Sequence, residues 1–159
     1  MALGGDVWRD TNGNGVQDET TPVGSVLVTL YDSTGATVLA TTLSKSDGTY
    51  LFTSDVVPAL VPGTTYTIGI VLPTDMQPTL ADVGSDSTDN DGRVRAGSVT
   101  DVRSGAVVAP LIGTDTTTDF GLVQRFTIGN FVWLDVSGEG RQDAGERALA
   151  GVSVAPVAS

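Results

Sequence analysis

The sequence DTNGNGVQD, from Asp10 to Asp18, places oxygen-bearing side chains at alternate positions and ends that run at Gly15. This is the pattern of the front half of an EF-hand-type calcium loop, in which acids or amides at the first, third and fifth positions precede a sharply turning glycine. Calcium takes six to eight hard oxygen ligands, and alternate residues of a curled loop can direct several of them to one point. By this template the expected ligands are the side chains of Asp10, Asn12, Asn14 and Asp18 and the carbonyl of Val16.

A second copy of the stretch explains where the first departs from the template. The twelfth position should be a bidentate Glu but is Thr21, and Glu19 lies two residues earlier. In the copy that starts 125 residues later, Glu146 does fall at the twelfth position. We therefore interpret the first loop as shortened by two residues, with Glu19 in the role of Glu146. The corresponding ligands of the second copy are Asp135, Ser137, Glu139, Arg141, Asp143 and Glu146.

The alternative to a calcium loop is a polar turn between two strands, since Asx and Gly residues also form such turns without a metal. Two copies, each directly after a Val-Trp strand end, favour calcium.

The two copies also define the domain organisation. Eight of the fifteen residues at positions 4–18 are identical at an offset of 125, which indicates tandem domains rather than a solenoid of short repeats. The expected domains are residues 3–125 and, from 126 to 159, the truncated start of a second repeat. That remainder is too short to bury a core of its own. We expect it to be disordered, to pack on the first domain, or to donate its strands at 126–134 and 151–155 to another molecule.

Composition excludes several classes of function. The chain has no histidine and no cysteine, which removes the usual general base, most zinc sites and thiol chemistry. Its net charge is −11, so nucleic acid and anionic membranes are poor partners and a cation is a good one. No apolar run approaches the length of a membrane span, so we expect no membrane insertion in this segment. Nothing marks an acid with a raised pKa, and we predict that the chain is not an enzyme.

Short runs rich in Val and Thr, broken by Gly and Pro, predict an all-β chain. Alternating apolar side chains point inward in the strands at 25–31 and 64–71. Residues 55–62 are apolar but bracketed by prolines, which predicts a loop over the core. The expected strands are 3–8, 25–31, 36–43, 49–53, 64–71, 93–102, 106–112 and 114–123.

Residues 80–92 form a long acidic loop with four aspartates within ten residues. Loops of this length are functional or disordered in most proteins, and clustered carboxylates repel one another unless a cation offsets them. The EF-hand register fits this loop poorly, so a second metal site and a solvated acidic loop both remain open.

The order of these motifs resembles an SdrD B-like repeat, the calcium-binding B-repeat of bacterial surface adhesins, which is related to the Cna B-type domains of collagen adhesins. The residues that carry the resemblance are Gly5-Asp6-Val7-Trp8, the loop from Asp10 to Asp18, Val26 to Asp32, Asp47 to Phe52, Pro62 to Thr67, Gly84 to Gly92 and Asp119-Phe120-Gly121-Leu122.

The resemblance implies a prealbumin-like or Ig-like β-sandwich of about seven to nine strands. It implies bound Ca²⁺ and tandem repeats that form an extracellular stalk at the bacterial cell surface. The partners would be adjacent repeats and, by strand addition, other copies. The ligands carried over are Asp10, Asn12, Asn14, Val16, Asp18 and Glu19 in the first loop and Asp86, Asp89 and Asp91 in the acidic loop.

Two other functions remain open beside the calcium-stabilised stalk. The chain could be a fibre or surface-layer subunit that assembles by donating its C-terminal strands, or a glycan- or protein-binding adhesion module. A Lys–Asn cross-link of the kind found in related domains is not expected, because the sole lysine, Lys45, lies between strands.

Overall fold

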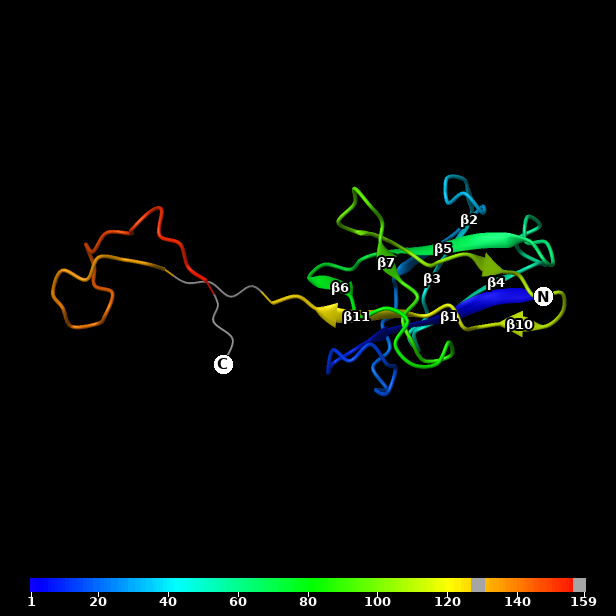
Figure 1. Cartoon of the computed structure of the whole chain (residues 1–159), viewed down its shortest axis with the longest axis horizontal. Coiled ribbons are helices and arrows are strands. Elements are labelled where there is room, and N and C mark those ends of the chain that lie inside the picture. The colour runs from blue at the N-terminus through cyan, green and yellow to red at the C-terminus, as the bar shows by residue number, and fades with distance from the viewer. Residues whose placement is uncertain (127–130, 156–159) are drawn as a thin grey trace. The chain divides into compact units, whose positions relative to one another are not determined.

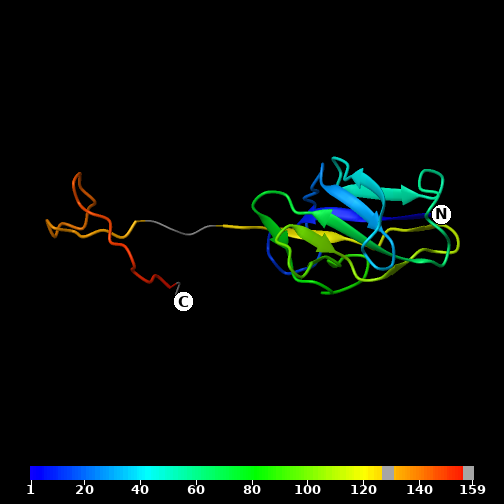
Figure 2. The ribbon, with the colours of Figure 1, turned by 90° about the horizontal axis from the view of Figure 1, so that it is seen from above.

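A computed structural model describes residues 1–126 and 131–155 of the chain. Contacts within the chain divide it into two compact units, Met1–Arg125 and Phe126–Ser159, and each is described by itself. Figure 1 shows unit 1 as a β-sandwich, and Figure 2 shows it from above.

The first sheet of unit 1 is built around the N-terminal strand β1 (Ala2–Arg9). Along one side, β1 pairs antiparallel with β4 (Thr49–Thr53). Along the other side it pairs in parallel with β10 (Thr114–Asp115) and then with β11 (Phe120–Gln124). The outer strand β6 (Met76–Pro78) pairs antiparallel with β11. The first and last strands of the unit therefore lie side by side.

The second sheet has the order β3-β2-β5-β8-β7. Its centre is β5 (Thr65–Val71), which lies between β2 (Leu27–Tyr31) and β8 (Asp101–Arg103). The edges are β3 (Val38–Leu43) and β7 (Arg93–Val94), and β9 (Val107–Val108) pairs with the start of β5.

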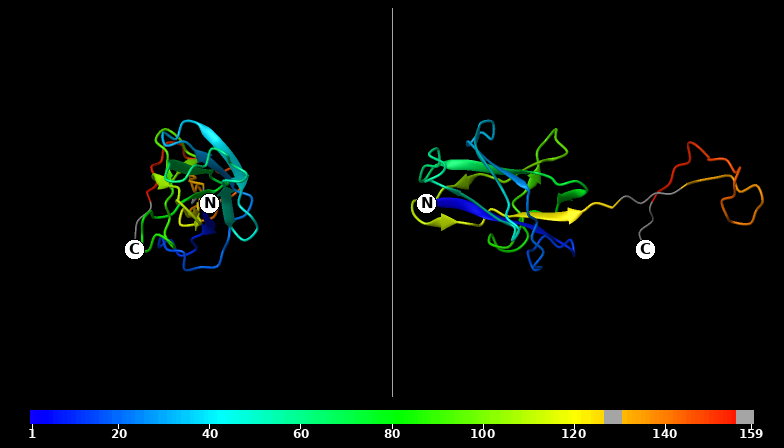
Figure 3. Two further views of the ribbon diagram at one scale, coloured as in Figure 1. Left: turned by 90° about the vertical axis from the view of Figure 1, so that its right-hand side faces the viewer. Right: turned by 180° about the vertical axis from the view of Figure 1, so that it is seen from behind.

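The core lies between the two sheets, which face each other in the end-on view of Figure 3. Side chains alternate along the strands, so every second residue is buried. Val57 and Leu60, in the loop predicted to cover the core, are also buried. The predicted all-β sandwich is confirmed. The central buried residues are Leu3, Val7, Val28, Leu30, Phe52, Ile68, Ile70, Val102, Phe120 and Leu122.

The strand pattern is more broken than the sequence predicted. The long strand expected at 93–102 is wrong: β7 and β8 form a hairpin around a turn, in which the amide of Ser98 donates to the carbonyl of Arg95 at 3.0 Å. Gly97 has φ +82°, a left-handed conformation that glycine adopts at no steric cost. The described residues hold eleven strands, five of them two or three residues long, against the expected seven to nine.

Unit 2 consists mainly of the repeated loop. Its described residues contain one isolated bridge, between Trp133 and Ala148, which corresponds to the bridge between Trp8 and Pro22 in unit 1. The strand expected at 126–134 lies partly outside the described residues, at 127–130. The strand expected at 151–155 is not formed, because none of the described residues supplies a ladder on which it could pair. Nowhere in the described parts of the chain is there a helix that could cross a membrane.

Candidate metal centre

Asp10 organises the first loop from its buried base. It follows β1 directly and is 2% exposed. One carboxylate oxygen accepts from the amide of Gly13 at 2.5 Å, and the other accepts from the amide of Gly15 at 2.8 Å. The hydroxyl of Thr79 also donates to Asp10, at 2.5 Å. Burial opposes ionisation, but the hydrogen bonds from Thr79 and these two amides outweigh it and hold the pKa of Asp10 below its usual value.

Both glycines of the loop need the left-handed conformation. Gly13 has φ +75° and Gly15 has φ +81°. These turns point successive amides back toward Asp10, which explains why the sequence alternates glycine with short polar residues here.

Asn12, Asn14 and Asp18 converge at the mouth of this loop. The side-chain amides of Asn12 and Asn14 donate to the two carboxylate oxygens of Asp18, at 3.1 and 3.0 Å. The oxygens of the same two amides accept from the backbone amides of Asn14 and Val16. The carbonyl of Val16, another predicted ligand, accepts from the amide of Asp18 at 2.9 Å. These predicted ligands therefore lie close together in the structure. The side-chain amides of Asn12 and Asn14 are the partners of the Asp18 carboxylate.

Glu19 closes the loop with half of its carboxylate. Its Oε1 accepts from the amide and the hydroxyl of Thr11, both at 2.8 Å, and from the amide of Asn12 at 3.0 Å. Its Oε2 is buried and has no hydrogen-bond partner. Because a buried carboxylate oxygen without a partner is costly, this atom is suited to a bound cation.

The loop of unit 2 repeats the hydrogen bonds that its first acid and the Oε1 atom of its glutamate accept. Asp135 accepts from the amides of Gly138 and Gly140 at 2.6 and 2.7 Å, as Asp10 does from Gly13 and Gly15. Glu146 Oε1 accepts from the amide of Val136 at 3.0 Å, as Glu19 does from Thr11. Glu19 and Glu146 therefore close their loops in the same way despite the difference of two residues in length.

The other expected ligands of the second copy lie on the surface. Ser137 donates from its hydroxyl to Asp135 at 3.1 Å, and the amide of Asp143 donates to Glu146 Oε2 at 3.0 Å. The exposed residues of this set are Ser137, Glu139, Arg141 and Asp143.

The acidic loop packs directly against the first loop. The amide of Gln17 donates to the carbonyl of Thr88 at 2.7 Å. Asp89 is only 7% exposed, and its Oδ1 has no hydrogen-bond partner. Burial, and then the negative charge of Asp86, raise the pKa of Asp89. Asp86 itself is exposed. Asp89 is therefore a second predicted ligand with an unsatisfied buried oxygen.

Asp91 contacts the residue that precedes the last strand. Its Oδ2 accepts from the amide of Asp119 at 2.7 Å. Burial is the main cause that raises the pKa of Asp91 to about 6, and the charges of Asp89 and Asp86 add to it. One oxygen of Asp91 is therefore held by the amide of Asp119, whereas Oδ1 of Asp89 has no partner.

Sequence reasoning missed the buried carboxylate of Asp119. It is 1% exposed and accepts from the amide of Asp6 at 2.7 Å. Burial raises its pKa to about 8, and the charges of Asp6 and Asp91 act in the same direction. Nearby, the hydroxyl of Tyr50 donates to the carbonyl of Thr118 at 2.5 Å. The sequence gives only a weak signal here, an aspartate directly before the apolar run that starts at Phe120.

Asn90, also missed, fixes the acidic loop to the sheet. It is fully buried, and its amide nitrogen donates to the carbonyls of Thr79 and Gly92, both at 3.1 Å. Its oxygen accepts from the amides of Gly92 and Gly121. The side chain of Asn90 thus supplies hydrogen bonds that connect the loop to β11, where the two backbones do not pair as strands.

The oxygen atoms of these loops suit a hard cation that binds uncharged oxygen ligands as well as carboxylates. Within residues 1–126 and 131–155, no group of three or more histidine, cysteine, aspartate or glutamate side chains is placed to hold a metal ion. A site here would therefore need amide and carbonyl oxygens beside the carboxylates, which is the ligand mixture that Ca²⁺ uses. The buried side-chain atoms without partners in the described residues are Glu19 Oε2, Asp89 Oδ1 and the indole nitrogens of Trp8 and Trp133. The first two fit a cation.

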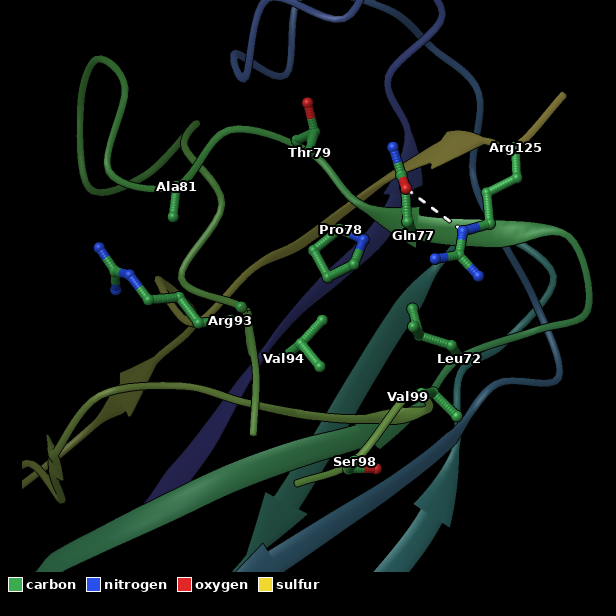
Figure 4. Close-up of a pocket in the computed structure, with 11 residues that line it drawn as sticks. Leu72, Gln77, Pro78, Thr79, Ala81, Arg93, Val94, Ser98, Val99 and Arg125 are labelled. Carbon is green, nitrogen blue, oxygen red and sulfur yellow. Dashed lines mark hydrogen bonds between the residues drawn. The ribbon is translucent and has the colours of Figure 1, made fainter. Parts of the chain in front are cut away.

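A separate groove of about 470 Å³ lies between β6 and β7. Figure 4 shows Arg93 and Arg125 on opposite sides of it, around Pro78 and Val94. Arg93 is paired with Asp82, and Arg125 donates to Gln77 at 3.3 Å. No aromatic side chain lines this groove, so it offers no ring on which a sugar could stack.

Comparison with known proteins gives a clear family match. The family model described as "SdrD B-like domain" matches residues 1–122. Over 155 residues the chain is 32% identical to serine-aspartate repeat-containing protein E of Staphylococcus aureus strain USA300 and 31% identical to the bone sialoprotein-binding protein of strain MRSA252. Each alignment covers 96% of this chain but only 12% of the relative, so the chain spans a small part of the length of these proteins.

Proposed function

Because the chain belongs to the family of SdrD B-like domains, we propose that it is a calcium-stabilised structural repeat that acts as a rigid spacer within a longer surface protein. The repeats of this family are not enzymes, in agreement with the prediction from the sequence. The relatives are staphylococcal surface adhesins, which supports the predicted location at the bacterial cell surface.

One observation carries the calcium proposal. Glu19 Oε2 and Asp89 Oδ1 are buried without partners, and both residues were predicted as ligands from the sequence. They belong to two loops that are hydrogen-bonded to each other through Gln17 and Thr88. A chain that leaves carboxylate oxygens unsatisfied at these two positions gains stability from any cation that reaches them.

We assign the binding role to residues of both loops. Asp10, Asn12, Asn14, Asp18, Glu19 and the carbonyl of Val16 would hold one ion, and Asp89 with Asp86 would contribute to a second. When bound, calcium supplies positive charge and accepts the hard oxygens of these groups. The loops then hold the strand ends that they follow, because the amide of Asp10 donates to the carbonyl of Leu122 at 2.8 Å and so ties the first loop to β11.

The expected gain in stability is modest for each ion. Extracellular modules bind calcium with a Kd of about 10⁻⁴ to 10⁻³ M. A tenfold excess of calcium over Kd adds roughly 1.4 kcal/mol per site to the free energy of unfolding. Two sites would supply a sizeable share of the stability of a domain of this size.

The test is a thermal melt of the whole chain in excess EDTA, in millimolar calcium and in millimolar magnesium. We expect calcium to raise Tm by about 4 to 10 °C, and magnesium to raise it much less. Glu19→Gln and Asp89→Asn should each remove part of the calcium response. Asp55→Asn, which neutralises an exposed acid outside both loops, is the matched control and should leave the response intact. Equal Tm values in EDTA and calcium would refute the proposal.

We further propose that residues 126–159 begin a second repeat. The hydrogen bonds of Asp135 and Glu146, which repeat those of Asp10 and Glu19, support this assignment. Adjacent repeats of the same polypeptide would then be the natural neighbours of this module.

A further inference from the structure

The edge strand β3 carries unpaired backbone groups. It lies at the end of the second sheet, with β2 on one side. The amide of Ser44 donates to the carbonyl of Val26 at 2.9 Å, and the β2–β3 register continues that pairing through Val28 and Thr42. Because bonded pairs alternate in an antiparallel ladder, the amides and carbonyls of Thr41 and Leu43 point away from β2. These groups face the open edge.

The other edges of unit 1 have protective features that β3 lacks. Edge strands invite pairing with another chain, and proteins counter this with short strands, charges and prolines. β6 has three residues and ends in Pro78, and β7 has two residues, with Arg93 beside the groove in Figure 4. β10 also has two residues. Among the described strands, only β3 combines an open edge, six residues and no charge or proline.

Strand β4 is closed by turns at both of its ends. Its outward carbonyls at Thr49 and Thr53 accept from the amides of Lys45 and Val57, at 2.9 and 2.8 Å. The bulge that interrupts the β2–β3 ladder lies near Val38, so the part of β3 from Ala40 to Leu43 is regular. This part remains available for pairing.

The sequence of β3 and its immediate flanks carries no charge. Residues 33–44 contain no charged side chain, and residues 33–74 contain only Lys45, Asp47 and Asp55, in a chain with a net charge of −11. Val38 and Leu43 are each 56% exposed. A groove of about 430 Å³ between β3 and β4 is lined in part by Leu51 and Val56.

We propose that a second copy of this chain pairs with this edge, with the two β3 strands antiparallel about a two-fold axis at Thr41. About this axis the outward groups of Thr41 bond to Thr41 of the other copy, and Leu43 lies opposite Leu39, the residue that the bulge leaves without a partner on β2. Two copies that carry a net charge of −11 each repel one another over most of their surface, and the uncharged β3 region is where that repulsion is least. The edge is therefore complementary to itself.

The pairing is expected to be weak. A single strand edge with its flanking side chains buries less than the roughly 1,200 Å² of a stable complex. We expect a Kd on the order of 10⁻⁴ M, which becomes effective where many copies are held close together.

The experiment is sedimentation velocity of the whole chain up to about 1 mM, in calcium and in EDTA, with charge variants at the axis. Thr41 is exposed, so its substitution leaves the core intact. Thr41→Lys alone and Thr41→Glu alone should abolish the dimer, because like charges would lie opposite each other. An equimolar mixture of the two variants should restore it. Thr114→Lys, on the exposed but short strand β10, is the matched control and should dimerise like the parent.

The outcomes separate clearly. Dimers of the parent and of the mixture, without dimers of either variant alone, establish pairing at Thr41. A parent chain that remains monomeric, a Thr41→Lys variant that dimerises normally, or a mixture that fails to restore the dimer would each overturn the proposal. Loss of the calcium-dependent rise in Tm would overturn the proposed function and leave this result untouched, since the edge lies outside both acidic loops.

Discussion

Asp10 makes its hydrogen bonds within the protein itself, so its replacement should destabilise the fold even without calcium. In Asp10→Asn one carboxylate oxygen becomes an NH₂ group, which can no longer accept from its partners. If the Oδ2 position is lost, two donors, the amide of Gly15 and the hydroxyl of Thr79, are left without their acceptor. Hydrogen bonds to a charged group contribute about 1.5 to 3 kcal/mol each, and the site is 2% exposed. We expect a loss of about 3 kcal/mol in the free energy of unfolding.

The assay is thermal and urea unfolding in excess EDTA, where no metal contributes. At about 4 °C per kcal/mol for a domain of this size, Tm should fall by about 12 °C. Glu19→Gln is the informative comparison, because its hydrogen bonds are exposed and it should cost about 1 kcal/mol or less in EDTA. Both variants should also lose part of the calcium stabilisation. An Asp10→Asn protein with the parent's Tm in EDTA would show that the carboxylate serves only the metal and would refute this reasoning.

Three further predictions concern the rest of unit 1. The folded state raises the pKa of Asp119 to about 8, whereas an unfolded aspartate titrates near 4, so the folded chain holds the extra proton between these values. Its stability in EDTA should therefore fall as pH rises from about 4 to 8, by up to about 5 kcal/mol, and Asp119→Asn should flatten this profile in urea titrations. Gly121→Ala should cost about 2 kcal/mol or more, because the new Cβ would lie 2.6 Å from the indole ring of Trp8; a variant that unfolds at the parent's urea concentration would contradict the tight packing. Arg103→Lys should cost about 1 kcal/mol in the same assay, since lysine cannot reproduce the planar stacking 3.4 Å above the ring of Tyr31, and an unchanged midpoint would argue against that stacking.

The alternating strands were predictable because their burial follows a local pattern. Tyr66, Ile68 and Ile70 were expected to point inward, and all three are buried. A period of two needs only neighbouring residues to be seen. The turn at Gly97 was missed, although a glycine followed by a serine in the middle of a strand-like run is a local sign of a turn.

The closeness of the residues in the first loop was predictable from the sequence, whereas contacts between distant segments were not. The first loop gathers its residues because they are close in sequence. Asp91 was predicted as a ligand beside Asp89, and its hydrogen bond with the amide of Asp119 was not foreseen. Asp6 and Asp119 meet although they are 113 residues apart, and only the parallel pairing of β1 with β11 brings them together. Such contacts depend on topology, which no short motif specifies.

The parallel pairing of β1 and β11 also determines how the module responds to mechanical force. In Figure 1 the chain enters at the start of β1, and β11 leads out of the opposite end of unit 1. Tension applied through the two ends therefore slides these strands past each other along their axes. The bonds between Val7–Arg9 and Phe120–Leu122 carry this load together, whereas strands peeled apart from one end would break their bonds one at a time. A repeat with this arrangement stays folded under pulling forces that would open a simple hairpin.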